Sequence, residues 1–98
     1  MERVERIFPQ NLPKALGPYS PVTAVGDLLF ISGQIPVNPE TGNVDQNNIE
    51  WQAHQAMKNL RSAVEGADSS MSHIAKTTIL LSDLGNFAKV NEIYGSYF

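Results

Sequence analysis

An apolar run, Leu28 to Ile31, stops abruptly at Ser32, Gly33 and the nearby Pro36. Such a run is typical of a buried strand, and the glycine and proline after it end the strand in a loop. Because Gly33 carries no Cβ, its backbone N–H can come close to a ligand. The Ser32 hydroxyl stands beside that N–H, so the two residues predict a corner that holds a small anionic group such as a carboxylate. A simple strand-ending turn is the alternative interpretation.

The pattern of the rest of the chain predicts a small sheet. Short strands are expected at residues 2–8, 22–25 and 28–32. Gly26-Asp27 is a tight hairpin signal between the last two of them, and the proline-rich residues 9–21 predict a rigid loop. Residues 74–82 are largely β-branched or aliphatic, which predicts a further strand that is buried on both sides.

Two helices are expected. The first carries an apolar stripe at steps of three and four residues, formed by Ile49, Ala53, Ala56, Met57, Leu60, Ala63 and Val64. Asn47 is its expected N-cap, with Glu50 as capping-box partner, and Gly66 is expected to end it in the left-handed conformation. The second begins near Asn86, and its expected apolar face comprises Phe87, Val90, Tyr94, Tyr97 and Phe98. Asn91 falls on that face, where its amide needs a hydrogen-bond partner.

Composition narrows the class of protein. The 98 residues suit one domain, 1–98, and the hydrophobic content of 42% is that of a globular chain. A formal net charge of −3 argues against a protein that grips nucleic-acid phosphates. The absence of cysteine excludes disulfides and thiol chemistry, and His54 and His73 lack the spacing of metal ligands. Neither a signal peptide nor a membrane-spanning run is evident, so a soluble cytoplasmic protein is expected.

Several motifs together resemble the RidA/YjgF family of reactive-intermediate deaminases. They fall in the order and at close to the spacing of that family, and they cover nearly the whole chain from about residue 10. The motifs are Gly17-Pro18-Tyr19-Ser20-Pro21, Ile31-Ser32-Gly33-Gln34-Ile35-Pro36, Lys76-Thr77-Thr78, Asp83-Leu84 and Val90-Asn91-Glu92-Ile93-Tyr94.

The resemblance implies an α+β fold of the chorismate-mutase-like, RidA type. In that fold a mixed, mostly antiparallel sheet carries both helices on one face. The family forms homotrimers that pack the other sheet faces together, with active sites in the clefts between subunits. Relatives add two strands after the second helix, and those strands are expected to be absent from this chain, so the domain is expected to be incomplete at its C-terminus.

The resemblance also implies a reaction. The family hydrolyses 2-imino acids, such as 2-iminobutanoate and 2-iminopropanoate, or their enamine tautomers, to 2-keto acids and ammonia. No cofactor is needed and no metal site is expected. The substrate-binding residues carried over from the family are Tyr19, Ser32, Gly33 and Asn91. For Asn91 a purely structural hydrogen bond is an equally weighted alternative.

The catalytic residues stay unassigned. In relatives the carboxylate-binding arginine and the water-positioning glutamate lie on the two final strands, beyond the position of Phe98. The 98 residues alone are therefore expected to show little deaminase activity. Two other functions remain open, a ribonuclease or translation inhibitor and a non-catalytic, chaperone-like trimer that binds small carboxylates. The acidic charge makes nucleic acid the less expected partner.

Overall fold

The computed structural model describes residues 3–98, and the first residue of the predicted strand 2–8 lies outside the described part. Along the chain, three strands are followed by one long helix, a stretch without regular structure and a short helix. The strands β1, β2 and β3 are Val4–Ile7, Val22–Val25 and Leu28–Ile31. The helices α1 and α2 are Ile49–Gly66 and Phe87–Gly95, and the 3-10 turns η1 and η2 are Met71–His73 and Leu84–Asn86. The α+β class is confirmed.

The sheet is a small antiparallel one in the order β1-β2-β3. Gly26 has a φ of 55° and occupies the first central position of the β2–β3 turn, as glycine does in type II′ hairpins, so the predicted hairpin is confirmed. The register places Ile7, Val22 and Ile31 side by side on one face, where Val22 is fully buried. The opposite face exposes Val4, Leu28 and Phe30. One face of the sheet is therefore packed against the core, whereas the other exposes apolar side chains beside Arg6 and Thr23.

Helix α1 forms much of the core, as its apolar stripe predicts. Met57, Ala63 and Val64 are buried. The prediction for its ends is wrong by one or two residues. Asn48, not Asn47, is the N-cap and accepts from the Trp51 N–H at 3.0 Å, and the left-handed residue after the helix is Asp68 (φ 64°) rather than Gly66. Neighbouring Asn residues are equally able to cap, so sequence alone does not choose between them.

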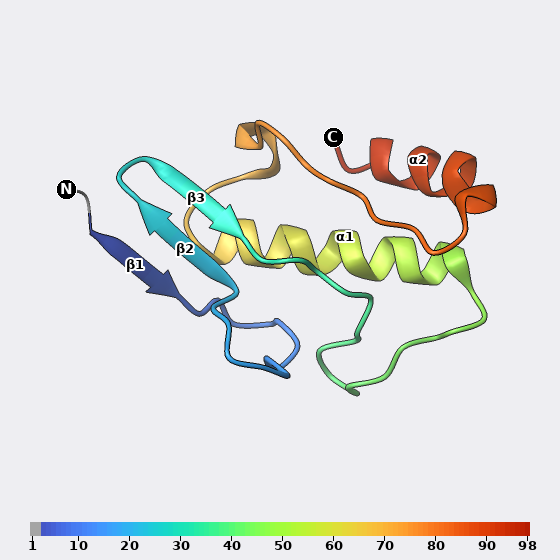
Figure 1. Cartoon of the computed structure of the whole chain (residues 1–98), viewed down its shortest axis with the longest axis horizontal. Helices are drawn as coiled ribbons and strands as arrows, with labels where there is room; N and C mark the ends of the chain where they lie inside the picture. The colour runs from blue at the N-terminus through green and yellow to red at the C-terminus, as the bar shows by residue number, and fades with distance from the viewer. Residues whose placement is uncertain (1–2) are drawn as a thin grey trace.

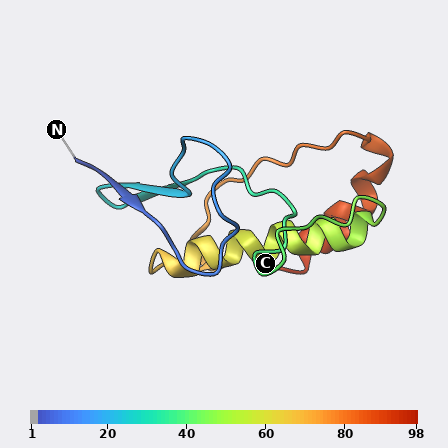
Figure 2. The same ribbon diagram turned by 90° about the horizontal axis from the view of Figure 1, so that it is seen from below.

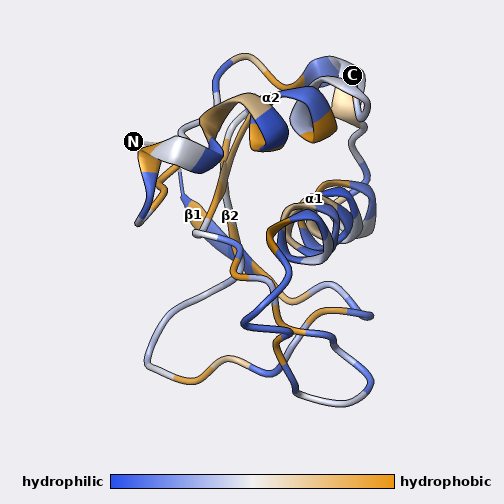
Figure 3. Cartoon of the chain, turned by 90° about the vertical axis from the view of Figure 1, so that its right-hand side faces the viewer, coloured by the Kyte–Doolittle hydropathy of each residue, from blue (hydrophilic) through white to orange (hydrophobic). Residues whose placement is uncertain are grey.

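Helix α2 lies beside the N-terminal half of α1 (Figures 1 and 3). An exposed ion pair joins Lys89 Nζ to Glu50 Oε1 at 3.5 Å, and the Arg61 guanidinium lies 5.4 Å from the centre of the Tyr97 ring. The buried face of α2 is formed by Val90 and Ile93. The predicted face was partly wrong, because Phe87 and Phe98 are 58% and 55% exposed.

Residues 74–82 contradict the prediction of a doubly buried strand. They run past the length of α1 in an extended path without joining the sheet (Figures 1 and 2). Leu80 is 89% exposed and Ile79 43%. The β-branched residues favour extended backbone, but a strand also needs a hydrogen-bonded neighbour, and none pairs with this segment within residues 3–98. In the same range no helix is long and apolar enough to cross a membrane.

Candidate functional site

Tyr19 and Gly33 line the same cavity, which has a volume of about 200 Å³. Tyr19 comes from the loop between β1 and β2, and Gly33 follows β3. Ile35 and Val37, from the same segment between β3 and α1 as Gly33, also line it. The cavity is smaller than the ~300–1,000 Å³ pockets that hold drug-sized ligands. Its size therefore suits a small metabolite, and the structure brings together two residues to which the family resemblance assigns substrate binding.

Gly33 has an open position in this cavity. A Cβ placed on it would meet no atom within 4 Å, so packing within the chain does not require glycine here. Its N–H makes no hydrogen bond within residues 3–98. A backbone donor that no protein group satisfies is available to water or to a ligand oxygen. Of the predicted anion-facing corner, the Gly33 N–H is therefore free of protein partners within residues 3–98.

Ser32 makes two hydrogen bonds to the β1–β2 loop. Its Oγ donates to the Ser20 carbonyl oxygen at 2.6 Å, and its N–H donates to the Pro21 carbonyl oxygen at 3.0 Å. Both bonds tie the end of β3 to the loop that carries Tyr19. Because the hydroxyl proton is directed to Ser20, a direct bond from Ser32 to a ligand carboxylate requires that contact to open. Ligand contact by Ser32 stays a prediction.

Asn59 is a further residue of the site that sequence reasoning missed. This α1 side chain is 1% exposed, and its Nδ2 donates to the carbonyl oxygens of Ile35 and Val37 at 3.0 and 2.9 Å. Gln55 Nε2 in turn donates to Asn59 Oδ1 at 2.9 Å. The amide thus fastens the cavity wall to α1. A polar residue on the apolar stripe is the only sequence signal for this role.

Asn91 does not join this arrangement. It is exposed, whereas the prediction placed it on the buried face of α2. The buried pair Val90 and Ile93 sets that face, and on an α-helix residue 91 lies about 100° from one and about 200° from the other. Its predicted part in substrate binding stays untested.

Lys14 is the second residue that sequence reasoning missed. It lies in the loop between β1 and β2 and lines the cavity with Tyr19 and Gly33. No Asp, Glu, His or Arg is among the lining residues of the described chain, so Lys14 carries the one formal charge there. The sequence offers only a weak signal, a lysine after Pro13 in a proline-rich loop.

The histidines serve local structure. His54 Nδ1 lies 2.9 Å from Tyr97 Oη, which links α1 to the chain end of α2, and His73 Nδ1 lies 2.8 Å from Ser70 Oγ in the η1 turn. Over residues 3–98 no three His, Cys, Asp or Glu side chains gather as metal ligands do.

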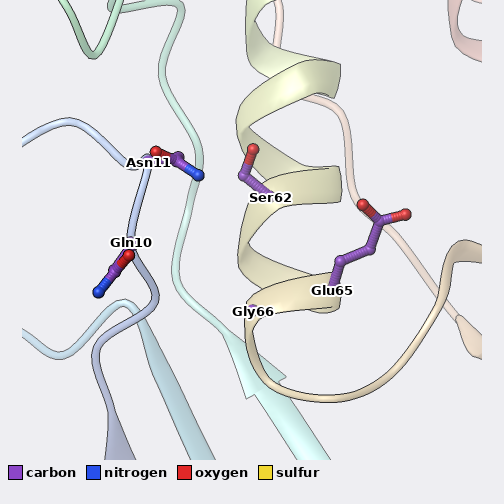
Figure 4. A pocket seen from close by; sticks show the side chains of 5 residues that line it. All are labelled: Gln10, Asn11, Ser62, Glu65 and Gly66. Atoms are coloured by element: carbon purple, nitrogen blue, oxygen red, sulfur yellow. The ribbon is translucent and has the colours of Figure 1, made fainter.

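A second cavity, of about 340 Å³, lies beside the C-terminal end of α1. Figure 4 shows that Asn11 and Ser62 point toward each other, whereas the Glu65 carboxylate extends to the other side of the helix, away from Gln10. One amide and one hydroxyl therefore face each other there, and no charged group joins them. The Tyr19–Gly33 cavity differs in that a charged residue, Lys14, and the unpaired N–H of Gly33 belong to its lining within the described residues.

Comparison with known proteins agrees with the resemblance. Reactive Intermediate Deaminase A, chloroplastic, of Arabidopsis thaliana is 39% identical over 94 residues, which are 96% of this chain and 50% of that protein. The conserved Rid family protein YyfA of Yersinia pestis superimposes with a TM-score of 0.93 at 40% identity, over 98% of this chain and 76% of the other. TdcF of E. coli with bound serine gives a TM-score of 0.91 at 37% identity, over 96% and 73%.

The solved relatives share the α+β fold, and their identities are high enough to indicate common descent. Residues 9–98 also match the family described as Endoribonuclease L-PSP. That range includes the strand-end corner, the tyrosine loop and both helices. The chain belongs to the RidA/YjgF family, the Rid proteins.

Proposed function

We propose that the chain acts in the hydrolytic deamination of reactive 2-imino acids, or their enamine tautomers, to 2-keto acids and ammonia. The observation that carries the proposal is the cavity shared by Tyr19 and the open N–H of Gly33. A relative named as a reactive intermediate deaminase and a solved relative that holds serine, a small carboxylate-bearing molecule, support it.

The reaction adds water to the C=N carbon. The nitrogen takes up protons, the C–N bond breaks, and ammonia leaves a 2-keto acid behind. In this proposal the Gly33 N–H donates to the substrate carboxylate, and the Tyr19 ring and hydroxyl form the wall beside it. No carboxylate or imidazole lines the described cavity, so its residues bind and orient the substrate, and orientation alone contributes rate. The general base is left unassigned.

The test uses 2-iminobutanoate generated in solution from threonine by a threonine dehydratase. Conversion to 2-oxobutanoate is followed with and without the full chain, and direct titration with 2-oxobutanoate measures binding. We expect saturable binding and a small acceleration over spontaneous hydrolysis, both reduced in Gly33→Ala because its methyl group would take up space in the cavity beside the N–H. Binding without acceleration would leave the non-catalytic, carboxylate-binding function in place of the deaminase. No saturable binding would contradict both.

The proposed assembly is a homotrimer with substrate clefts between subunits. The uncovered sheet face carries Val4, Leu28 and Phe30, each more than half exposed, and Val4, Val25 and Leu28 form an apolar row across the paired strands beside Arg6 and Thr23. Such a surface is typical of protein–protein contacts. Light scattering should give a mass three times the 10.8 kDa of one chain, and Leu28→Asp should reduce it. A monomeric mass for the unmodified chain would contradict the assembly. The proposed location is the cytoplasm.

The ribonuclease alternative is favoured by one finding, the description of the matching family as Endoribonuclease L-PSP. A net charge of −3 opposes it. Incubation with a labelled single-stranded RNA at low and moderate salt separates the two functions. We expect neither retention nor cleavage, and cleavage lost with Tyr19→Phe or Gly33→Ala would instead assign the cavity to RNA.

A further inference from the structure

Residues 75–82 have an extended backbone that bonds to no other backbone group of residues 3–98. Ile74, just before them, and Asp83, just after them, have extended backbone angles (φ −73°, ψ 124° and φ −128°, ψ 110°). In Figure 2 this orange segment runs along one border of the ribbon. Its N–H and carbonyl groups are therefore available to water or to a second extended chain.

The side chains of this segment favour strand pairing. Its centre is uncharged and free of proline and glycine, and it consists of Thr77, Thr78, Ile79, Leu80, Leu81 and Ser82. Short stretches of this composition pair readily with another strand, and identical copies pair with each other. Thr78, Ile79 and Leu80 are exposed, so a neighbouring strand can reach them.

Opposite charges stand at the two ends of the stretch, Lys76 before it and Asp83 after it. Both residues are exposed, and neither forms an ion pair within the part of the chain that the structure describes. An antiparallel pair of two copies can set Lys76 of each copy against Asp83 of the other, which places opposite charges together at both ends. A parallel, in-register pair would set like charges against each other. The charges therefore favour the antiparallel arrangement.

We propose that residues 75–82 are an interaction surface for a second copy of this chain, which binds by antiparallel strand pairing across a two-fold axis. The register that joins the two charges also sets further residues opposite each other: Thr77 and Ser82, Thr78 and Leu81, and Ile79 and Leu80. The surface is separate from the sheet face of the proposed trimer, so the inference does not rest on the proposed function. A pairing of this length is weak, so it forms in concentrated protein and leaves the segment unpaired in dilute solution.

The first test uses single-cysteine variants, because the chain has no cysteine of its own. Thr78→Cys and Leu81→Cys are oxidised separately and as an equal mixture at the same total concentration, and covalent dimers are measured by intact mass. Opposite Cα atoms of an antiparallel pair are about 4.5–5.5 Å apart, which a disulfide can span. In the proposed register the same position in the two copies lies about 10 Å or more apart, beyond its reach. We expect the mixture to cross-link about tenfold faster than either variant alone.

The second test measures self-association of concentrated protein by sedimentation equilibrium. Lys76→Glu and Asp83→Lys should each weaken association about tenfold, since each sets like charges opposite at both ends of the pair. An equal mixture of these two variants should regain the association, because opposite charges then face each other. Lys58→Glu makes the same charge change at an exposed position of α1, outside the segment, and should stay within about twofold of the unmodified chain.

Three results would overturn the proposal. Faster cross-linking of each cysteine variant alone than of the mixture would mean parallel, in-register pairing. Equal weakening by Lys76→Glu and Lys58→Glu would mean that general charge repulsion, and not the paired ends, controls association. A mass that does not rise with concentration, together with equally slow cross-linking in all samples, would mean that no second copy binds this segment, and it would leave the proposed trimer and the proposed function standing.

Discussion

Two extended segments of this molecule, residues 32–38 and residues 74–82, differ in how they are held. The first is fastened at several points, by Ser32 to the Tyr19 loop and by Asn59 to Ile35 and Val37. The second has one side-chain hydrogen bond to another element within the described chain, between Thr77 Oγ1 and Tyr94 Oη at 2.6 Å. The first lines a cavity, and the second leaves Leu80 89% exposed.

The difference shows that side-chain hydrogen bonds to other elements, and not strand pairing, hold the wall of the site in place. Neither segment belongs to the sheet, yet 32–38 keeps a fixed wall because a buried amide satisfies its carbonyl groups. The extended apolar segment 74–82 has no such partner. We expect the two segments to respond differently to substitution, and the predictions below rank those responses.

The largest effect is expected at Asn59. Asn59→Ala removes the donor to two carbonyl groups at the cavity wall, and leaving them unpaired should cost about 2–4 kcal/mol of unfolding free energy. Urea unfolding measures this loss. Gln55→Ala, which removes only the donor to Asn59 Oδ1, is the control and should cost about 1 kcal/mol. Equal costs would mean that the wall is held by something other than the amide.

Gly66 tests the contact between α1 and the β1–β2 loop, which also carries Tyr19. A Cβ on this residue would lie 2.5 Å from Pro9 Cβ, so Gly66→Ala forces the start of the β1–β2 loop away from α1. Overpacking should cost about 1–3 kcal/mol, partly offset by the better helix propensity of alanine. Gly95→Ala is the matched control, because nothing lies within 4 Å of its added Cβ. In thermal unfolding, Gly66→Ala should have a lower Tm than the unmodified chain, and Gly95→Ala should not. An unchanged Tm for Gly66→Ala would mean that the loop lies farther from the helix.

The loosely held segment should respond less. Tyr94→Phe removes the bond to Thr77, which should cost about 0.5–1.5 kcal/mol and raise amide hydrogen exchange over residues 74–82. Tyr97→Phe, which loses a bond to the exposed His54, is the control and should leave that exchange unchanged. Unchanged exchange in Tyr94→Phe would show that another contact holds the segment.

The smallest effect is expected at Leu80. Leu80→Ser changes a side chain that is 89% exposed, so urea unfolding should differ by less than about 0.5 kcal/mol. Val64→Ser, at a site 3% exposed, is the buried control and should cost more than about 2 kcal/mol. A cost above about 1 kcal/mol for Leu80→Ser would mean that this leucine is covered in solution, which would weaken the contrast between the two segments.

Local sequence patterns correctly predicted the features that depend on interactions between residues close together in the chain. The hairpin at Gly26 and the apolar stripe of α1 follow from spacing alone, and both are confirmed. The pairing of Tyr19 with Gly33 came from the resemblance, and the structure places both in one cavity. Where a structural feature depends on contact with a distant segment of the chain, the sequence pattern was insufficient to predict it.

Three residues illustrate that limit. Leu80 lies in a run that favours extended backbone, but the sequence does not say whether a neighbouring strand is present to bury it. Asn59 bonds to carbonyl groups more than twenty positions away, which no local pattern encodes. The prediction for Asn91 depended on which face of α2 packs against the core. The packed face lies about one residue around the helix from the predicted one, and Asn91 is exposed.

The most direct test follows the backbone amide of Gly33 by two-dimensional ¹⁵N NMR during titration with 2-oxobutanoate. If the N–H of this residue binds the ligand carboxylate, its amide resonance should shift and saturate with the same affinity as resonances of the Tyr19 loop. Resonances of residues around Ser62 should not shift. Saturable shifts that leave Gly33 unmoved would contradict the account.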